Sequence, residues 1–345
     1  MSEDLTVEPF EGPADGWNDL LGRFEGATFC HLYGWRRVME DALGHQTHWW
    51  VAREPGGEIG GVLPLTRVRS RLFGDYLISM PFLNYGGPVG SPKAREALAR
   101  RAAEEARTLG VDLLELRNRV ELVAEPLERN QRKLTVVKTL PESSEDLWED
   151  GLRSKVRSQV RRPMKEGMEV RDGAELLDPF YDVFSTTMRD LGTPVLSKGF
   201  FESIREHLSD AVVFMTVELE GEPLAAGCGL HWGGELEITW AGASRDHARL
   251  SPNMLLYWGM MEKAIELGLE RFNFGRCTPD SGTHRFKRQW GTEDHPLPWL
   301  QWSESGIPSP PDPDSPKYRT AIDVWRRLPV GLTNRIGPPI SRLLP

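Results

Sequence analysis

The residues best suited to chemistry gather near the end of a short aromatic strand predicted at residues 271–275. The strand ends in Gly275-Arg276, and a turn then leads to a compact basic segment that contains His284 and Lys287. This order brings two cations and a histidine to one end of a strand. Such a set suits a substrate that is anionic or that carries an acyl group.

Acyl transfer to an amine requires a neutral nucleophile, donors that stabilise the tetrahedral oxyanion, and an acceptor for the amine proton. Lys287 and Arg276 are candidates for stabilising the developing negative charge or for holding a phosphate. His284, Glu237 and Asp280 are candidates for accepting the proton, directly or through water. For His284, a structural hydrogen-bonding role is the alternative. The sequence does not separate these roles.

Glu237 belongs to an alternating segment, Glu235-Leu236-Glu237-Ile238-Thr239-Trp240. Because side chains alternate between the two faces of a strand, the two glutamates and Thr239 share one face. That face either borders a site or faces solvent.

The chain reads as two similar α/β (α+β) halves, each a mixed sheet flanked by helices, with a helical connector at 143–167 between them. Each half begins with a strand hairpin marked by its turn residues and continues with a helix and a further strand. Ser251 is the predicted N-cap of the second of these helices, and Gly268 closes it. The predicted hairpins are 47–52 with 59–69 and 212–218 with 224–232, and the helix and strand pairs are 92–109 with 111–117 and 252–267 with 271–275.

Six motifs follow one another along the chain. They are the run from Leu63-Pro64-Leu65 to Ser79-Met80-Pro81-Phe82-x-Asn84-Tyr85-Gly86-Gly87, Arg153-Ser154-Lys155-Val156-Arg157, Leu191-Gly192-Thr193-Pro194, Asn253-x-x-x-Tyr257, Phe272-Asn273-Phe274-Gly275-Arg276, and Phe286-Lys287-x-x-Trp290-Gly291. With these motifs in this order, the chain resembles the FemAB/FemABX-like acyltransferases of the GNAT superfamily, and more closely their branch associated with exosortase and exopolysaccharide systems. The resemblance spans roughly residues 30 to 300.

The resemblance implies two tandem GNAT-like domains, at 1–140 and 141–302, followed by a Pro-rich linker and basic tail at 303–345. It implies a transferase that forms an amide on an amine of a cell-envelope, peptidoglycan or exopolysaccharide precursor. No cofactor is expected to stay bound, and the donor is an aminoacyl-tRNA or an acyl-CoA. The expected catalytic residues are Lys287, His284 and Glu237, and the expected substrate-binding residues are Asn84, Tyr85, Arg153, Arg157, Thr193, Asn253, Tyr257 and Arg276.

Several of these motifs have plain structural alternatives. Asn84-Tyr85-Gly86-Gly87 is either a loop that lets a ligand approach the backbone or a tight turn. Leu191–Pro194 is adequately explained as a helix C-cap followed by proline. The basic run 153–165, a helix interrupted near Pro163, places Arg153, Arg157 and Arg161 on one face, which either holds phosphates or is solvated.

The donor is constrained by the segment 245–253, which precedes the helix at 252–267. CoA-dependent GNAT enzymes normally bind pyrophosphate with a glycine-rich turn at a helix N-terminus. This segment contains no glycine, and Pro252 removes an amide. The departure argues against conventional CoA binding and favours an aminoacyl-tRNA donor. A CoA-dependent N-acyltransferase is the alternative enzyme, and a non-catalytic binding module in a surface-polymer assembly system is the alternative outside enzymes.

Composition sets the outer limits. The chain has 345 residues, 39% apolar residues and a formal net charge of −9, typical of a globular protein whose surface as a whole repels nucleic acid. No apolar run is long enough to span a bilayer and the N-terminus is acidic, which predicts a cytoplasmic protein. Cys30, Cys228 and Cys277 lack the spacing of a metal site and are expected to be reduced thiols, with Cys277 as a less favoured nucleophile.

The C-terminal region changes character. Residues 303–316 are rich in Ser, Pro and Asp and are expected to form a linker. The tail at 318–345 alternates large apolar residues with arginines. It is expected either to make peripheral contact with the inner membrane face or to dock on its own domain or on a partner subunit.

Overall fold

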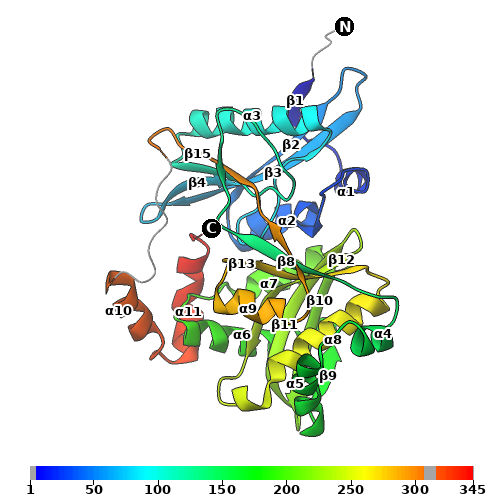
Figure 1. Cartoon of the computed structure of the whole chain (residues 1–345). Coiled ribbons are helices and arrows are strands. Elements are labelled where there is room, and N and C mark those ends of the chain that lie inside the picture. The colour runs from blue at the N-terminus through cyan, green and yellow to red at the C-terminus, as the bar shows by residue number, and fades with distance from the viewer. Residues whose placement is uncertain (1–4, 307–315, 345) are drawn as a thin grey trace.

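The computed structural model describes residues 5–306 and 316–344, which form two mixed sheets stacked along the long axis of the molecule (Figure 1). The first sheet follows the order β1-β2-β3-β4-β6-β15-β7, with β5 paired to β3. Its strands are β1 (Thr6–Pro9), β2 (Gln46–Arg53), β3 (Ile59–Ser70), β4 (Gly74–Ile78), β5 (Val89–Gly90), β6 (Leu113–Leu116), β7 (Glu128–Asn130) and β15 (Trp299–Trp302).

The second sheet follows the order β14-β8-β13-β12-β11-β10-β9 and lies below the first in Figure 1. Its strands are β8 (Leu134–Thr139), β9 (Glu169–Asp172), β10 (Val212–Leu219), β11 (Glu222–Trp232), β12 (Glu235–Ala243), β13 (Arg271–Cys277) and β14 (Glu293–Pro296). The two predicted hairpins are confirmed as the antiparallel pairs β2 with β3 and β10 with β11.

The two sheets share one design, which confirms the predicted pair of tandem α/β units. Each contains a parallel pair whose strands are joined by a helical crossover: β4 and β6 through α3 (Pro92–Leu109), and β12 and β13 through α8 (Pro252–Glu266). A parallel pair needs such a crossover because its strands run in the same direction. In both halves the crossover helix packs against its own sheet and helps to enclose a separate apolar core.

The sheets also exchange strands. β8 joins the second sheet between β13 and β14, whereas β15 returns to the first sheet between β6 and β7. The predicted boundary at residue 140 therefore follows a strand of the second sheet, and the one at 302 follows a strand of the first. The division into 1–140 and 141–302 stays a prediction about folding units.

A third apolar core crosses from one half to the other. Trp35 of α2 (Gly34–Arg37) lies 6.4 Å, centroid to centroid, from Phe200 of α7 (Lys198–His207), and Phe200 also contacts Trp240 of β12. Burial of these large rings holds the halves in a fixed relation. The other helices are α1 (Ala14–Leu21), α4 (Ser144–Glu149), α5 (Ser154–Lys165), α6 (Leu177–Leu191), α9 (Gly282–Arg288), α10 (Pro316–Trp325) and α11 (Val330–Ser341), with short helical turns at Phe29–His31, Val38–Ala42, Ala174–Leu176 and Ala248–Leu250.

Two local predictions need correction. Ser251 does not cap α8 with its side chain, because its backbone takes the left-handed conformation at φ 59°. The connector is two helices separated at residues 150–153, and α5 continues two residues beyond Pro163. Pro163 has no N–H to donate to the carbonyl oxygen of Gln159, and the helix ends two residues later.

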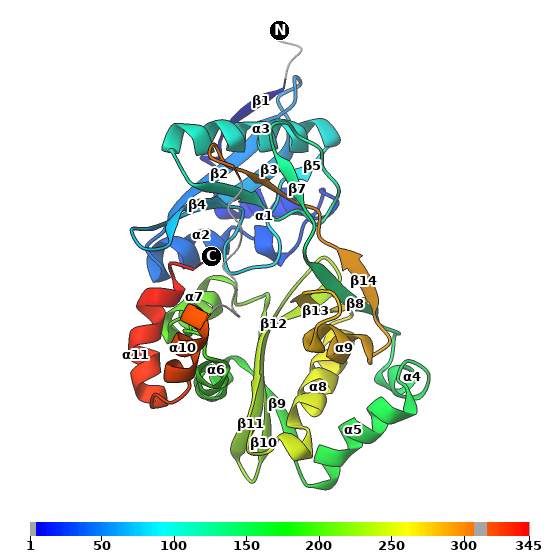
Figure 2. The same ribbon diagram turned by 60° about the vertical axis from the view of Figure 1, so that its left-hand side comes forward.

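The tail folds back onto the second half, on the left of Figure 2. Asn334 of α11 donates to Ser185 of α6, and His45 Nε2 lies 2.8 Å from the carbonyl oxygen of Arg342. Docking on its own chain, one of the expected arrangements, is therefore observed. Most of the predicted linker, residues 307–315, lies outside the described residues. Among the residues described, no helix has both the length and the apolar character needed to cross a bilayer.

Candidate functional site

The parallel strands β12 and β13 pair over three residues only and then separate. Residues 235–237 face 271–273, after which the chain bends at Gly275, whose φ is 74°. Beyond that bend, Arg276 pairs with β8 and Trp240 pairs with β11. No strand lies between the facing edges 239–243 and 274–277 in the described sheet. Open strand edges offer backbone groups to an extended ligand.

Lys287 lies at this separation. Its Nζ donates to the carbonyl oxygens of Gly275, at 2.7 Å, and Arg276, at 3.0 Å. These bonds fix α9 against the bend in β13. The side chain is buried, and burial lowers the pKa of Lys287 to about 8. An ammonium has three protons, so two are committed to the backbone and one is left for another acceptor.

Glu237 is fully buried on β12, beside the same bend. Its Oε1 accepts a hydrogen bond of 2.6 Å from Asn84 Nδ2, and its Oε2 is buried without a hydrogen-bond partner. Burial, followed by the charge of Glu235, raises the pKa of Glu237 to about 7. The face of β12 that carries both glutamates is covered by the first half of the chain. The expectation that this face is merely solvated is therefore wrong.

The loop that carries Asn84 is held rigidly. Arg117 donates to the carbonyl oxygens of Met80 and Leu83, and His31 Nε2 lies 2.8 Å from the carbonyl oxygen of Gly87. A Cβ on Gly87 would lie 2.2 Å from Asn118 Oδ1, so close packing requires the glycine. The loop is thus a tight turn that positions Asn84, and Gly87 serves packing and leaves no open approach for a ligand.

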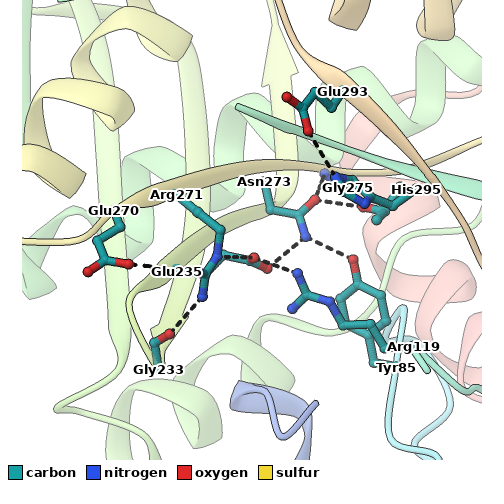
Figure 3. A network of polar contacts seen from close by, with 11 residues as sticks. Tyr85, Arg119, Gly233, Glu235, Glu270, Arg271, Asn273, Gly275, Glu293 and His295 are labelled. Atoms are coloured by element: carbon teal, nitrogen blue, oxygen red, sulfur yellow. Dashed lines mark hydrogen bonds and ion pairs between the residues drawn. The ribbon is translucent and has the colours of Figure 1, made fainter. Parts of the chain in front are cut away.

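Glu235 is the centre of a buried polar network that joins the two halves (Figure 3). Its carboxylate accepts hydrogen bonds from Arg119 at 2.5 Å, Asn273 at 2.9 Å and Arg271 at 3.3 Å. Asn273 also donates to the hydroxyl of Tyr85 at 2.8 Å. Although burial opposes ionisation, Arg119 holds the pKa of Glu235 below its usual range. The charge of Glu235 therefore persists at neutral pH and helps to raise the pKa of Glu237.

Arg276 adds a cation beside this network. The guanidinium carbons of Arg276 and Arg117 lie 4.8 and 5.0 Å from the ring centroid of Trp299 on β15. Arg117 is bound to Glu115 at 2.8 Å, whereas Arg276 has no side-chain hydrogen bond or ion pair in the described part of the chain. Burial and the charge of Arg117 lower the pKa of Arg276 to about 10. A guanidinium in this setting suits an anionic ligand.

His284 has both ring nitrogens engaged. Its Nδ1 accepts the backbone N–H of Asp280 at 2.9 Å, and its Nε2 lies 3.0 Å from both carboxylate oxygens of Asp294. These bonds fix the start of α9, from which Lys287 extends. In this arrangement neither nitrogen is available to a substrate, which supports the structural alternative. Burial also raises the pKa of the Cys277 thiol, which makes the thiolate needed for nucleophilic attack scarcer.

On the predicted basic face of α5, two arginines hold the neighbouring helix α4 and a third is exposed to solvent. Arg157 donates to the carbonyl oxygens of Trp148 and Glu149, and Arg161 lies over the Trp148 ring, so both hold α4 in place. Arg153 is exposed at the start of α5. It lines a hollow of about 390 Å³ together with Arg285 and Arg288 of α9. Lys155, Arg162 and Lys165 of the same run are exposed as well, so these cations are also open to a phosphate.

The remaining predicted site residues form no hydrogen bond or ion pair with Glu237 in the described part of the chain. Tyr257 stacks on Phe274, with 5.3 Å between centroids, and its burial raises its pKa to about 12. Asn253 lies in the first turn of α8. Thr193 is exposed, and its amide donates to Met188 in the C-cap that Gly192 closes. The structure thus brings Glu237, Asn84, Tyr85, Arg276 and Lys287 together.

Sequence reasoning missed the residues that surround this group, namely Glu235, Arg119, Asn273, Arg117 and Trp299. Asn273 and Glu235 both stood in segments already singled out, and their alternation with apolar neighbours was the available signal. No local signal in the sequence indicated Arg117, Arg119 or Trp299, because these residues reach the site from the other half of the molecule.

Comparisons with known proteins bear on part of the sequence and on the fold. Residues 152–288, from the connector to the end of α9, match the family described as "Acetyltransferase (GNAT) domain". The UDP-N-acetylmuramoylpentapeptide-lysine N(6)-alanyltransferase of Weissella viridescens is 24% identical over 131 residues. That match spans 37% of this chain and 39% of the alanyltransferase, well under two thirds of its length.

Solved structures extend the likeness in fold to most of the chain. FemX superposes with a TM-score of 0.66 and 15% identity, over 86% of this chain and 97% of FemX. A tandem GNAT protein from the clavulanic acid biosynthesis pathway gives a TM-score of 0.51 at 13% identity, over 89% of this chain and all of that one. Residues 152–288 are therefore similar to a GNAT acetyltransferase domain, and most of the chain has the fold of FemX and of a tandem GNAT protein.

Proposed function

We propose that this protein transfers an aminoacyl or acyl group to a primary amine, with Glu237 as the proton acceptor. The observation that carries the proposal is a fully buried carboxylate with one oxygen unpartnered, at the point where β12 and β13 separate. A buried polar atom without a partner is costly unless a ligand or water satisfies it. An amine bound there would satisfy Oε2 and lose its proton to it.

The amine nitrogen attacks the carbonyl carbon of the donor ester or thioester and forms the new N–C bond. The proton released by nitrogen passes to Glu237, and collapse of the tetrahedral intermediate breaks the bond to the leaving oxygen or sulfur, which takes up a proton. A base whose pKa is about 7 suits this exchange at neutral pH.

Lys287 and Arg276 have supporting roles in the proposal. The third proton of Lys287 Nζ is a donor for the oxyanion, since the other two are held by Gly275 and Arg276. The Arg276 guanidinium would hold an anionic part of either substrate. Tyr85 orients Asn273, and Asn84 orients Glu237. Asn253, Tyr257 and Thr193 are proposed only as lining of the bound substrates.

The backbone before α8 favours an aminoacyl-tRNA donor over an acyl-CoA. Pro252 has no amide, and the amides of Ala248, Leu250, Ser251 and Met254 all donate to carbonyl oxygens within the same loop. Few amides are left to cradle a pyrophosphate. The hollow lined by Arg153, Arg285 and Arg288 offers guanidinium groups to a phosphate backbone instead. A CoA-dependent N-acyltransferase remains the alternative.

The proposed acceptor is an amine of a cell-envelope precursor. The name of the Weissella viridescens relative identifies a lysine of a muramoyl pentapeptide as the acceptor of that protein. We extend to this chain only the class, a lysine or amino-sugar amine on a peptidoglycan or exopolysaccharide precursor. The exosortase-associated branch rests on the sequence motifs, and a location at the cytoplasmic side stays a prediction. A non-catalytic binding module is the alternative outside enzymes.

The test supplies purified protein with an amine acceptor, either a lysine-containing muramoyl peptide or an amino sugar. A pool of radiolabelled aminoacyl-tRNAs and a pool of labelled acyl-CoAs are supplied separately, and label in the acceptor is measured. Glu237→Gln is run beside the wild type, because it keeps the shape of the side chain and removes the base. We expect transfer from the tRNA pool and a loss of roughly 100-fold or more in the variant.

Each outcome decides between the alternatives. Transfer from acyl-CoA alone would show that the donor is an acyl-CoA and not an aminoacyl-tRNA. It would leave the proposed role of Glu237 unchanged. Transfer that Glu237→Gln does not slow would remove Glu237 from the mechanism. Acceptor binding without transfer from either pool would favour the binding module.

A further inference from the structure

The docked tail, helices α10 and α11, buries small residues and exposes large apolar ones. Helix α11 turns its small residues inward, at Thr333, Gly337 and Ser341, which are buried at a spacing of four residues. Ser341 Oγ donates to the carbonyl oxygen of Val195, and a Cβ on Gly337 would lie 3.1 Å from the amide nitrogen of Val195. The inward face is therefore a close backbone contact.

Large apolar side chains point outward from the same helices. Leu332 and Ile336, one turn apart on α11, are 42% and 37% exposed. Val324 on α10 and Leu344 after α11 are exposed as well. These four are nearly half of the nine large exposed apolar residues among the described residues, although the two tail helices form a small part of the chain. Apolar residues gathered in this way mark an interaction surface.

The charge of the tail separates it from the rest of the chain. Residues 316–345 contain six basic residues and a single acidic one, a formal charge of +5, whereas the whole chain carries −9. Arg327, Arg335 and Arg342 are exposed, and their side chains have no ion-pair partner in the described part of the chain. The cations therefore face outward together with the apolar residues.

The first half contributes to the same surface. Arg69 of β3 and Arg342 line a common hollow of about 230 Å³ with His45 and Leu343. Both views place the turn between β3 and β4 beside the C-terminal end of α11 (Figures 1 and 2). That turn carries Leu72, which is 81% exposed. The surface thus joins both halves of the chain.

We propose that this surface, Leu72, Val324, Leu332, Ile336 and Leu344 with their flanking arginines, docks on an anionic lipid bilayer. Exposed apolar side chains flanked by arginines enter the interface of a bilayer, and anionic headgroups attract the arginines. The tail stays folded on its own chain through its inward face while its outward face contacts lipid. This inference does not depend on the acyl-transfer proposal.

The test is co-sedimentation of the full chain with vesicles of phosphatidylcholine, with and without phosphatidylglycerol, at low and high salt. We expect binding only to the anionic vesicles and release at high salt. Leu332→Gln with Ile336→Gln should weaken binding roughly tenfold, because less apolar surface enters the bilayer. Arg327→Glu with Arg335→Glu should weaken it by about fivefold or more for each arginine.

Matched controls change exposed residues elsewhere. Val123→Gln and Leu267→Gln remove exposed apolar side chains, and Arg132→Glu reverses an exposed arginine. These variants should bind vesicles like the wild type. Because every substitution is at the surface, thermal melting should show that all variants are folded.

Three results would overturn the proposal. The first is equal sedimentation with and without phosphatidylglycerol, or none with either. The second is a wild-type dimer in light scattering that Leu332→Gln with Ile336→Gln dissociates, which would assign the surface to a second copy. The third is retention of RNA that the arginine variants lose while their vesicle binding is unchanged, which would assign it to nucleic acid.

Discussion

Asn84 and Glu237 are 153 positions apart in the sequence and are joined by a hydrogen bond of 2.6 Å. The donor comes from a tight turn of the first half, and the acceptor from a strand of the second. This contact occupies one oxygen of Glu237 and leaves the other unpartnered. The candidate site is therefore a property of the two halves together.

Glu237→Gln should alter stability in a pH-dependent way. The folded protein holds the Glu237 proton more tightly than the unfolded chain does, because burial raises the pKa from 4.5 to about 7. The wild type therefore loses stability as pH rises from about 4.5 to 7, by on the order of 3 kcal/mol. Urea unfolding should find the variant more stable than the wild type above neutral pH and similar near pH 4. A variant less stable at both pH values would contradict this account.

Asn84→Ala should shift the pH dependence of the reaction upward. The hydrogen bond from Asn84 favours the charged form of Glu237, so its loss raises the pKa of that carboxyl further. The active form is the carboxylate, and the rate at neutral pH should fall while the inflection moves to higher pH. Asn84→Asp, which adds a like charge, should move the inflection further still. An inflection that stays in place in both variants would separate Asn84 from Glu237.

Lys287→Met should lower both stability and activity. The carbonyl oxygens of Gly275, buried, and Arg276, partly buried, lose their donor, which lowers the free energy of unfolding by about 1–3 kcal/mol. The positive charge of Lys287 also favours the ionised form of Glu237, so the inflection of the pH–rate profile should rise. Lys287→Arg keeps the charge and should retain part of both properties. Full activity in a stable Lys287→Met would exclude a role in the reaction.

His284→Ala should destabilise the protein but leave the rate of acyl transfer nearly unchanged. Its bonds to Asp294 and to the amide of Asp280 fix α9, so the midpoint of thermal unfolding should fall. Asp294→Asn, which weakens the same contact, is the matched variant. Below that midpoint, transfer per folded molecule should stay within roughly threefold, whereas loss of a general base costs roughly 100-fold or more. A rate loss of that size in His284→Ala alone would restore the histidine as the base.

Local patterns in the sequence determined the elements of both halves. The hairpins 46–53 with 59–70 and 212–219 with 222–232, and the helices 92–109 and 252–266, were predictable because turn residues and hydrophobic periodicity act over short distances. The same local order identified Lys287, Arg276 and Glu237 as candidates, since they flank the end of β13 or alternate along β12.

The tertiary structure decided what surrounds those candidates. Exchange of β8 and β15 between the sheets brings Trp299 to the site, together with Thr135 of β8, whose hydroxyl donates to Asn273 Oδ1 at 2.7 Å. No local pattern in the sequence indicates a pairing between strands so far apart. The pKa of Glu237 depends on burial beneath the first half and on Glu235, which keeps its charge through Arg119. Tertiary packing also decides that one oxygen of Glu237 is unpartnered, that both ring nitrogens of His284 are bonded, and which face of α11 is exposed. These contacts join residues far apart in the sequence, so they exist only in the folded chain.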